Sequence, residues 1–168
     1  MVGTTDTQVL TNKTLTNPTP SINSAITGIR FTGQHTDSAV TGTTNETTLA
    51  TLVIPANILG SNGALRITAL FSGTGTNTKT HRIKFGGTTF ASLSTSSSST
   101  VFGEIVIVNR NATNSQISHP TIGDGSSGSA VVTGSVDTTQ SQNVVITGQL
   151  NNVADSITLG YVFVEVVK

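Results

Sequence analysis

The chain has 168 residues with eight basic and eight acidic side chains, and only 10% of its residues are charged. This length predicts one domain with a hydrophobic core, plus an extension. The balanced charge gives no basic stripe for nucleic acid and no polybasic run for an anionic membrane. The absence of cysteine excludes disulfides, thiol catalysis and thiolate zinc sites.

The rest of the composition points to β-structure. Thr, Ser, Asn and Gly dominate the sequence, and no stretch places apolar residues at helical spacing. Thr favours strands because its branched Cβ suits a pleated surface, while Gly, Asn and Ser supply turns. We therefore predict an all-β protein with an uncharged, hydroxyl-rich surface.

Residues 1–45 are predicted to form an extended leader. Within it, the sequence LTNKT at 10–14 is followed at once by LTNPT at 15–19. Pro18 and Pro20 exclude a helix and favour extended backbone. A leucine every five residues alternates between the two faces of a strand. Such a leader would contact apolar partners on two sides, as when identical chains wrap around a common axis; a disordered tail is the alternative.

The main domain is predicted over 46–168. Before it, 28–31 indicates a short strand and 32–44 a polar connection. The predicted strands of the domain are 47–54, 64–71, 78–85, 88–93, 101–109, 129–136, 143–150 and 156–167. Many short strands with closely spaced turns are typical of sandwiches and barrels. We predict a jelly-roll-like antiparallel β-sandwich. An immunoglobulin-like sandwich is the alternative, less favoured because the Cys–Trp–Cys pattern is missing.

Two local patterns in this domain predict specific geometry. The run Ile105-Val106-Ile107-Val108 is apolar on both faces of its strand, which indicates a strand covered on both sides. The dipeptide Asn62-Gly63 predicts a tight turn with Gly63 at positive φ.

No residue pattern indicates catalysis or metal binding. His35, His81 and His119 lack the spacing of metal ligands. The Gly-rich segment 123–129 holds one carboxylate, Asp124, whereas a calcium loop needs several. No serine lies in a Gly-x-Ser-x-Gly elbow. We therefore predict a protein that is not an enzyme and that has no catalytic residue, no bound metal and no cofactor.

Two segments resemble proteins of tailed bacteriophages. The sequence TDTQVLTNKTLTNPT at 5–19 resembles the D-T-L-T-N-K-T-L-T-x-P-T segment that recurs in their tail fibres and other appendages, with Val9 where a threonine is common. The pattern T-L-x-x-x-x-I-P-A-N-x-L-G-x-N-G-x-L-R-I, within 47–87, is similar to C-terminal β-sandwich domains of phage virion proteins. The resemblance implies a trimeric, non-enzymatic virion component with the jelly roll at its outer end.

This resemblance also sets the expected partners and location. The chain would be assembled in the host bacterial cytoplasm and displayed on the virion surface as a tail-fibre or head-fibre component, with host attachment as the role of its β-sandwich. Its expected partners are itself, as a homotrimer, other virion proteins through the leader, and a bacterial surface glycan or protein. Nucleic acid and membrane insertion are not expected. The alternatives are a capsid decoration protein that stabilises the phage head and a non-viral carbohydrate-binding β-sandwich module.

The candidate site residues fall into three groups. The resemblance implies virion attachment or trimer contact for seven leader residues: Leu10, Thr11, Asn12, Lys13, Thr14, Leu15 and Pro18. The run Ile105 to Val108 is the candidate trimer interface or core. Loops are expected to carry receptor contacts because the strands are committed to packing. The candidate receptor-facing residues are Asn111, Asn114 and Asp124, in the predicted loops 111–116 and 121–128. Two further predicted loops are 72–78 and 94–100.

Overall fold

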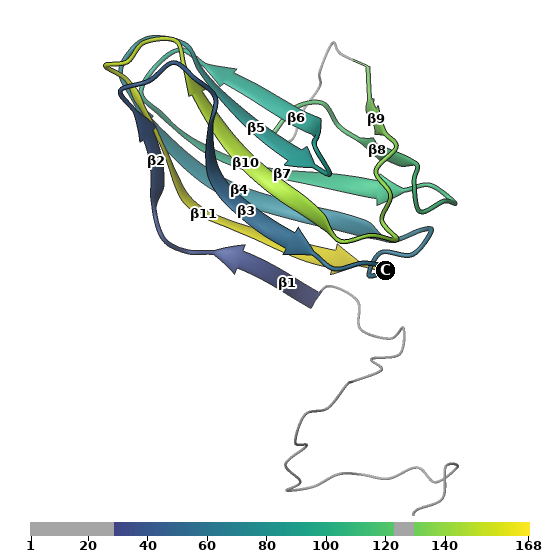
Figure 1. Ribbon diagram of the computed structural model, residues 1–168. Coiled ribbons are helices and arrows are strands. Elements are labelled where there is room, and N and C mark those ends of the chain that lie inside the picture. The colour runs from purple at the N-terminus through teal and green to yellow at the C-terminus, as the bar shows by residue number, and fades with distance from the viewer. Residues whose placement is uncertain (1–28, 123–129) are drawn as a thin grey trace, which may run out of the picture.

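The computed structural model describes residues 29–122 and 130–168, which form two antiparallel sheets packed face to face (Figure 1). The predicted all-β sandwich is confirmed. Its strands are β1 (Ile29–Gln34), β2 (Ser38–Thr41), β3 (Thr47–Ile54), β4 (Ala64–Thr74), β5 (Lys79–Phe85), β6 (Thr88–Thr95), β7 (Ser99–Asn109), β8 (Gln116–Ser118), β9 (Val132–Gly134), β10 (Gln142–Leu150) and β11 (Ser156–Val167).

The strand order is that of a jelly roll. The larger sheet runs β1-β11-β4-β7-β8-β9, with β2 also paired to β11, and the smaller sheet runs β3-β10-β5-β6. If β1 and β2 are counted as one edge strand and the short β8 and β9 are left aside, eight strands remain, four in each sheet. The chain crosses repeatedly between these two groups of four. The short strands β8 and β9 extend the larger sheet past β7.

The core lies between the two sheets. Strand β5 shows why the sequence folds this way, because its side chains alternate between buried and partly exposed along its whole length. Each large apolar side chain buried there contributes about 1.5–3 kcal/mol relative to exposure. The largest fully buried apolar side chains are Phe71, Phe85, Phe90, Leu65, Ile67, Ile83, Ile107, Ile146, Leu150, Ile157 and Leu159.

Strands β1 and β2 belong to the larger sheet, although the boundary predicted at residue 45 placed both in the leader. Strand β1 pairs with β11 from Ile29↔Val166 to Gln34↔Val162, and β2 pairs with the first part of β11. Val40 of β2 is a buried core residue. The sequence predicted a short strand at 28–31, which overlaps β1, but placed it outside the domain, and it did not predict β2. Both strands are short, and their partner β11 lies at the other end of the chain, so local patterns do not reveal the pairing.

The described residues cover strand β7 on one face only, so they do not supply the predicted cover on its second face. Ile105 and Ile107 point into the core and are buried, whereas Val106 is 37% exposed and Val108 is partly exposed. Within 29–122 and 130–168, the strands form only two layers, and none lies over the outer side of β7.

The Asn62-Gly63 turn is built differently from the prediction. Gly63 is not among the residues at positive φ, whereas Asn57 and Gly60 in the same connection are. The N–H of Gly63 donates to the carbonyl oxygen of Leu59 at 3.1 Å, and a β-carbon at position 63 would lie only 2.2 Å from that oxygen. Glycine is therefore required at position 63 because the backbone of Leu59 lies so close to it, and not because its own φ is positive.

Candidate functional site

The outer face of the larger sheet carries an unusual share of the aromatic side chains. Phe102 of β7 is opposite Leu70 of β4, and Leu70 is opposite Tyr161 of β11, so these three residues form one row across three strands. The ring of Phe163 stacks on that of Tyr161 with centroids 5.6 Å apart. Phe102 is 63% exposed. The chain has six Phe and one Tyr, so placing three of them on this face is a departure from ordinary burial.

We call this set of residues the outer aromatic row: Phe102, Leu70, Tyr161 and Phe163. Beside it, Arg66 of β4 lies between two carboxylates. Its Nε is 3.4 Å from Glu104 Oε1 of β7, and its NH1 is 3.5 Å from Glu165 Oε2 of β11. Val106 is the cross-strand neighbour of Arg66. These three charges are thus paired with one another across β7, β4 and β11.

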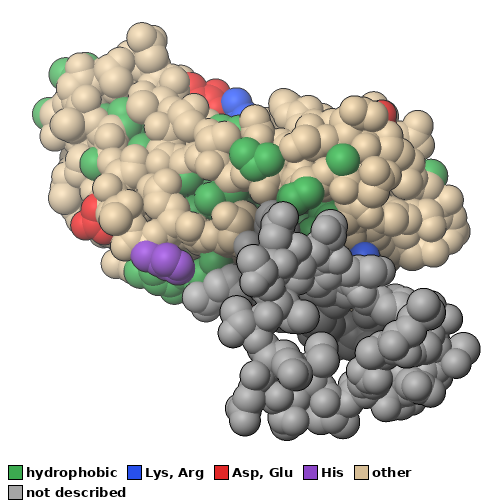
Figure 2. All heavy atoms as spheres, turned by 60° about the horizontal axis from the view of Figure 1, so that its bottom comes forward, with side chains coloured by type: hydrophobic (Ala, Val, Ile, Leu, Met, Phe, Trp, Pro, Cys, Tyr) green, Lys and Arg blue, Asp and Glu red, His purple; other side chains and the backbone are tan. Residues whose placement is uncertain are grey.

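The outer face of the smaller sheet is more polar. Glu46 lies 2.5 Å from Lys84 Nζ and 3.6 Å from Arg82 NH1, and it accepts a hydrogen bond from the Thr147 hydroxyl. The hydrogen bonds from Lys84 and Thr147 and the nearby positive charges hold the pKa of Glu46 below its usual value despite partial burial. Figure 2 shows one side of the molecule, on which backbone and side chains that are neither hydrophobic nor charged dominate and charged side chains are few.

The loop after β7 holds two of the predicted receptor-facing residues on a fixed frame. Asn111 adopts φ 55° and its N–H donates to Asn62 Oδ1 at 3.0 Å, while Asn114 is exposed. The loop is closed by a hydrogen bond from Arg110 N–H to the Ser115 carbonyl oxygen. Behind it, the buried Asn109 side chain donates to the carbonyl oxygen of Gly60 at 2.6 Å. The side chains of this loop are therefore presented by an ordered backbone.

This loop lies at the end of the sandwich where β1 starts. Ile29 is opposite Val166, Val166 is opposite Leu65, and Leu65 is opposite Ile107, close to the end of β7. In Figure 1 the start of β1 and the C-terminus lie at this same end. The connections 75–78, 96–98 and 151–155 lie at the opposite end. The structure thus separates the predicted receptor-facing loops into two groups at the two ends.

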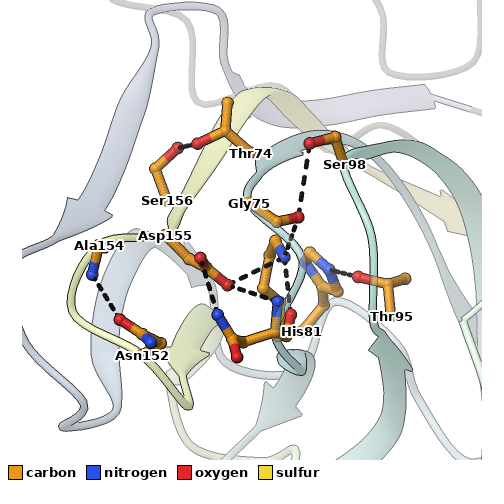
Figure 3. Close-up of polar contacts among 11 residues, drawn as sticks. Thr74, Gly75, His81, Thr95, Ser98, Asn152, Ala154, Asp155 and Ser156 are labelled. Atoms are coloured by element: carbon orange, nitrogen blue, oxygen red, sulfur yellow. Dashed lines mark hydrogen bonds and ion pairs between the residues drawn. The ribbon is translucent and has the colours of Figure 1, made fainter.

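A buried ion pair lies at this opposite end of the sandwich, which we call the far end (Figure 3). Lys79 Nζ lies 3.3 Å from Asp155 Oδ2 and also donates to the carbonyl oxygens of Gly75 and Asn77 at 3.1 and 2.7 Å. Asp155 accepts two hydrogen bonds from Asn77, through its backbone and its side chain. The Lys79 stem lies against Gly73, where a β-carbon would be 3.0 Å from its Cδ. This cluster joins the loop before β5 to the loop before β11.

The ionisation of this cluster follows from its contacts. Burial raises the pKa of Asp155, but the hydrogen bonds from Asn77 and Lys79 outweigh it and hold the pKa below the usual value. His81 is buried in the same end, with its ring 4.8 Å from that of Phe71. Burial, aided by the positive charge of Lys79, lowers the pKa of His81 to about 4. His81 is thus buried and neutral at pH 7.

An open hollow lies on the smaller sheet next to this cluster. It has a volume of about 310 Å³ and is lined by Thr78, Thr80, Gln149, Leu150 and Asn151. The lining offers hydroxyl and amide groups but no aromatic ring and no charge. It therefore has no group suited to acid–base catalysis.

Several predicted site residues lie outside the described part of the chain. These are the leader residues Leu10, Thr11, Asn12, Lys13, Thr14, Leu15 and Pro18, and the loop residue Asp124. Among the residues that the structure does describe, no three His, Cys, Asp or Glu side chains are grouped as metal ligands. That same part of the chain contains no helix long and apolar enough to cross a bilayer.

Comparison of the chain with protein-family models, with curated proteins and with solved structures finds no match.

Proposed function

We propose that this protein is a structural component of a tailed-bacteriophage virion, a trimeric fibre or appendage subunit that displays a jelly-roll domain on the particle surface. The observation that carries the proposal is the segment 5–19, whose wording resembles a recurrent appendage motif, joined to a β-sandwich. The low charge and hydroxyl-rich surface suit a particle exposed to variable salt. Assembly would take place in the cytoplasm of the host bacterium.

Within this proposal, the two ends of the sandwich have different roles. Residues 1–28 precede Ile29, so a leader that attaches to other virion proteins joins the sandwich at the end that also carries Asn111 and Asn114. The connections 75–78 and 96–98 lie at the opposite end, farther from the junction of the leader with β1. We therefore propose that contact with a bacterial surface glycan or protein is made by these far-end loops, and that Asn111 and Asn114 face the particle. This proposal departs from the sequence-based expectation that Asn111 and Asn114 face the receptor.

Localisation on virions tests the proposed function directly. Antibodies against the purified chain should label gradient-purified particles of the phage that encodes it, as seen by immunogold electron microscopy. We expect the gold at a fixed position, on tail or head fibres. Gold spread evenly over the capsid shell would instead support the decoration alternative, and particles that lack the chain by mass spectrometry would remove both virion roles.

A cell-binding comparison tests the assignment of the two ends. We expect Thr76→Lys combined with Ser97→Lys to reduce binding of the trimer to host cells by roughly tenfold or more, because three linked sites multiply the loss at each one. Asn111→Lys combined with Asn114→Lys is the matched control and should leave binding unchanged. Fluorescence-labelled protein on intact cells gives the measurement. If the control pair alone abolished binding, the receptor contact would lie at the leader end.

A further inference from the structure

We propose that copies of this chain associate through the outer face of the larger sheet, with the outer aromatic row of one copy packed against the same face of the next. The inference deepens the proposed function and rests on it for the number of copies, three. Phe102, Leu70 and Tyr161 would then lie nearest the common axis, and the smaller sheets would face outward.

The apolar content of the two outer faces decides which one is buried. The larger sheet presents the outer aromatic row together with Val106 and Val108. Each face carries one group of three paired charged residues, so the aromatic content separates them. Beside its charges the smaller sheet presents hydroxyl side chains, with Val53 on its edge strand as an exposed large hydrophobic residue. Aromatic residues are enriched in the fully buried centre of interfaces, from which charged residues are depleted. The larger sheet fits that description better.

The charges on the proposed surface are compatible with a second copy. Arg66 lies between Glu104 and Glu165, so both signs are present on one small area. When the same surface meets itself around a closed axis, Arg66 of one copy can approach Glu104 of the next. Because each charge already has a partner in its own chain, packing against another copy leaves none of these three charges buried alone.

The position of the leader gives a second argument for a copy of the same chain. Strand β1 lies at the edge of this sheet, beside β11, and residues 1–28 precede it. Three copies with this face inward would bring the three points at which a leader joins β1 to the same end of the assembly. That arrangement supplies what the leucine repeat at 10–19 needs, apolar partners from identical chains on both sides of each extended segment.

The test uses the full chain and one matched pair of variants. Phe102→Glu places a charge on the proposed surface, and Val53→Glu places one on the other sheet at a similarly exposed position. By light scattering coupled to size exclusion, wild type and Val53→Glu should have about three times the chain mass of 17.2 kDa, and Phe102→Glu one times that mass. Circular dichroism verifies that both variants keep their β-sheet.

Crosslinking gives an independent measurement. The chain has no cysteine, so a single introduced thiol can react only with the same thiol of another copy. A short bis-maleimide should join copies of Phe102→Cys and leave Val53→Cys monomeric on a denaturing gel. An oligomer that survives Phe102→Glu, or that is crosslinked only by Val53→Cys, overturns this face and leaves the virion role to the localisation test.

A wild-type chain that is monomeric at micromolar concentration also overturns the inference. If removal of residues 1–28 then produced oligomers, the occupant of the face would be the chain's own leader. A twofold mass that falls to one in Phe102→Glu supports the face and contradicts the trimer.

Discussion

Replacing Lys79 with methionine is expected to lower the free energy of unfolding by about 3–5 kcal/mol, because it leaves the Asp155 carboxylate buried without its cation. Methionine keeps an unbranched apolar chain along Gly73 and removes only the ammonium group with its three hydrogen bonds. For a chain of this size the melting temperature should fall by about 6–20 °C, which differential scanning calorimetry measures.

Two further variants identify the cause of that loss. Lys84→Met removes an ammonium group from the partly exposed pair with Glu46 and should cost about 1 kcal/mol or less. Lys79→Met combined with Asp155→Leu removes both buried charges, and we expect it to melt above Lys79→Met alone. If Lys79→Met and Lys84→Met melted at the same temperature, the buried pair would not be what holds the two far-end loops.

This ion pair has a function-related consequence within the proposed role. Lys79 and Asp155 are 76 positions apart in the sequence, yet their ion pair joins the loop before β5 to the loop before β11. Loops held in one geometry lose less conformational entropy when they bind a partner. Under that proposal the cluster holds the contact loops in one geometry, and Lys79→Met should weaken cell binding even where the domain stays folded.

Sequence patterns predicted the strands with local signals well and missed those without them. The predicted segments 47–54 and 156–167 agree with β3 and β11, because alternation and flanking Pro or Asn mark them. Strand β2 and the short β8 were missed, since segments of three or four residues are too short to show a periodicity. The predicted strand 129–136 is reduced to β9, Val132–Gly134, within the described residues.

The candidate site shows the same limit. Alternation along 79–85 puts Ile83 and Phe85 on one face, and its extension backwards puts His81 and Lys79 on that inward face too. That signal could have indicated a buried lysine, but its partner Asp155 lies in a loop with no pattern. The outer aromatic row is likewise assembled from three strands, so only their register brings its members together.

Removal of residues 1–42 is expected to destabilise the sandwich strongly, although the boundary predicted at residue 45 implies that such a cut would leave the domain folded. The cut deletes β1 and β2, the strands that pair with β11 at the edge of the larger sheet. Val40 is buried in the core and alone contributes about 1.5–3 kcal/mol. The Gln34 side chain also donates to the Leu49 carbonyl oxygen of β3 at 3.3 Å, so a bond between the sheets is lost.

The matched control is a chain that starts at Ile29 and keeps both strands. We expect its β-sheet circular dichroism to match that of the full chain, whereas the chain that starts at Thr43 should be largely unfolded at 37 °C. The reason is that the loss of Val40 and of the edge hydrogen bonds is a large fraction of a typical domain stability of about 5–15 kcal/mol. If both truncated chains melted alike, the β11 edge would be stable without a partner, and the domain would begin at β3.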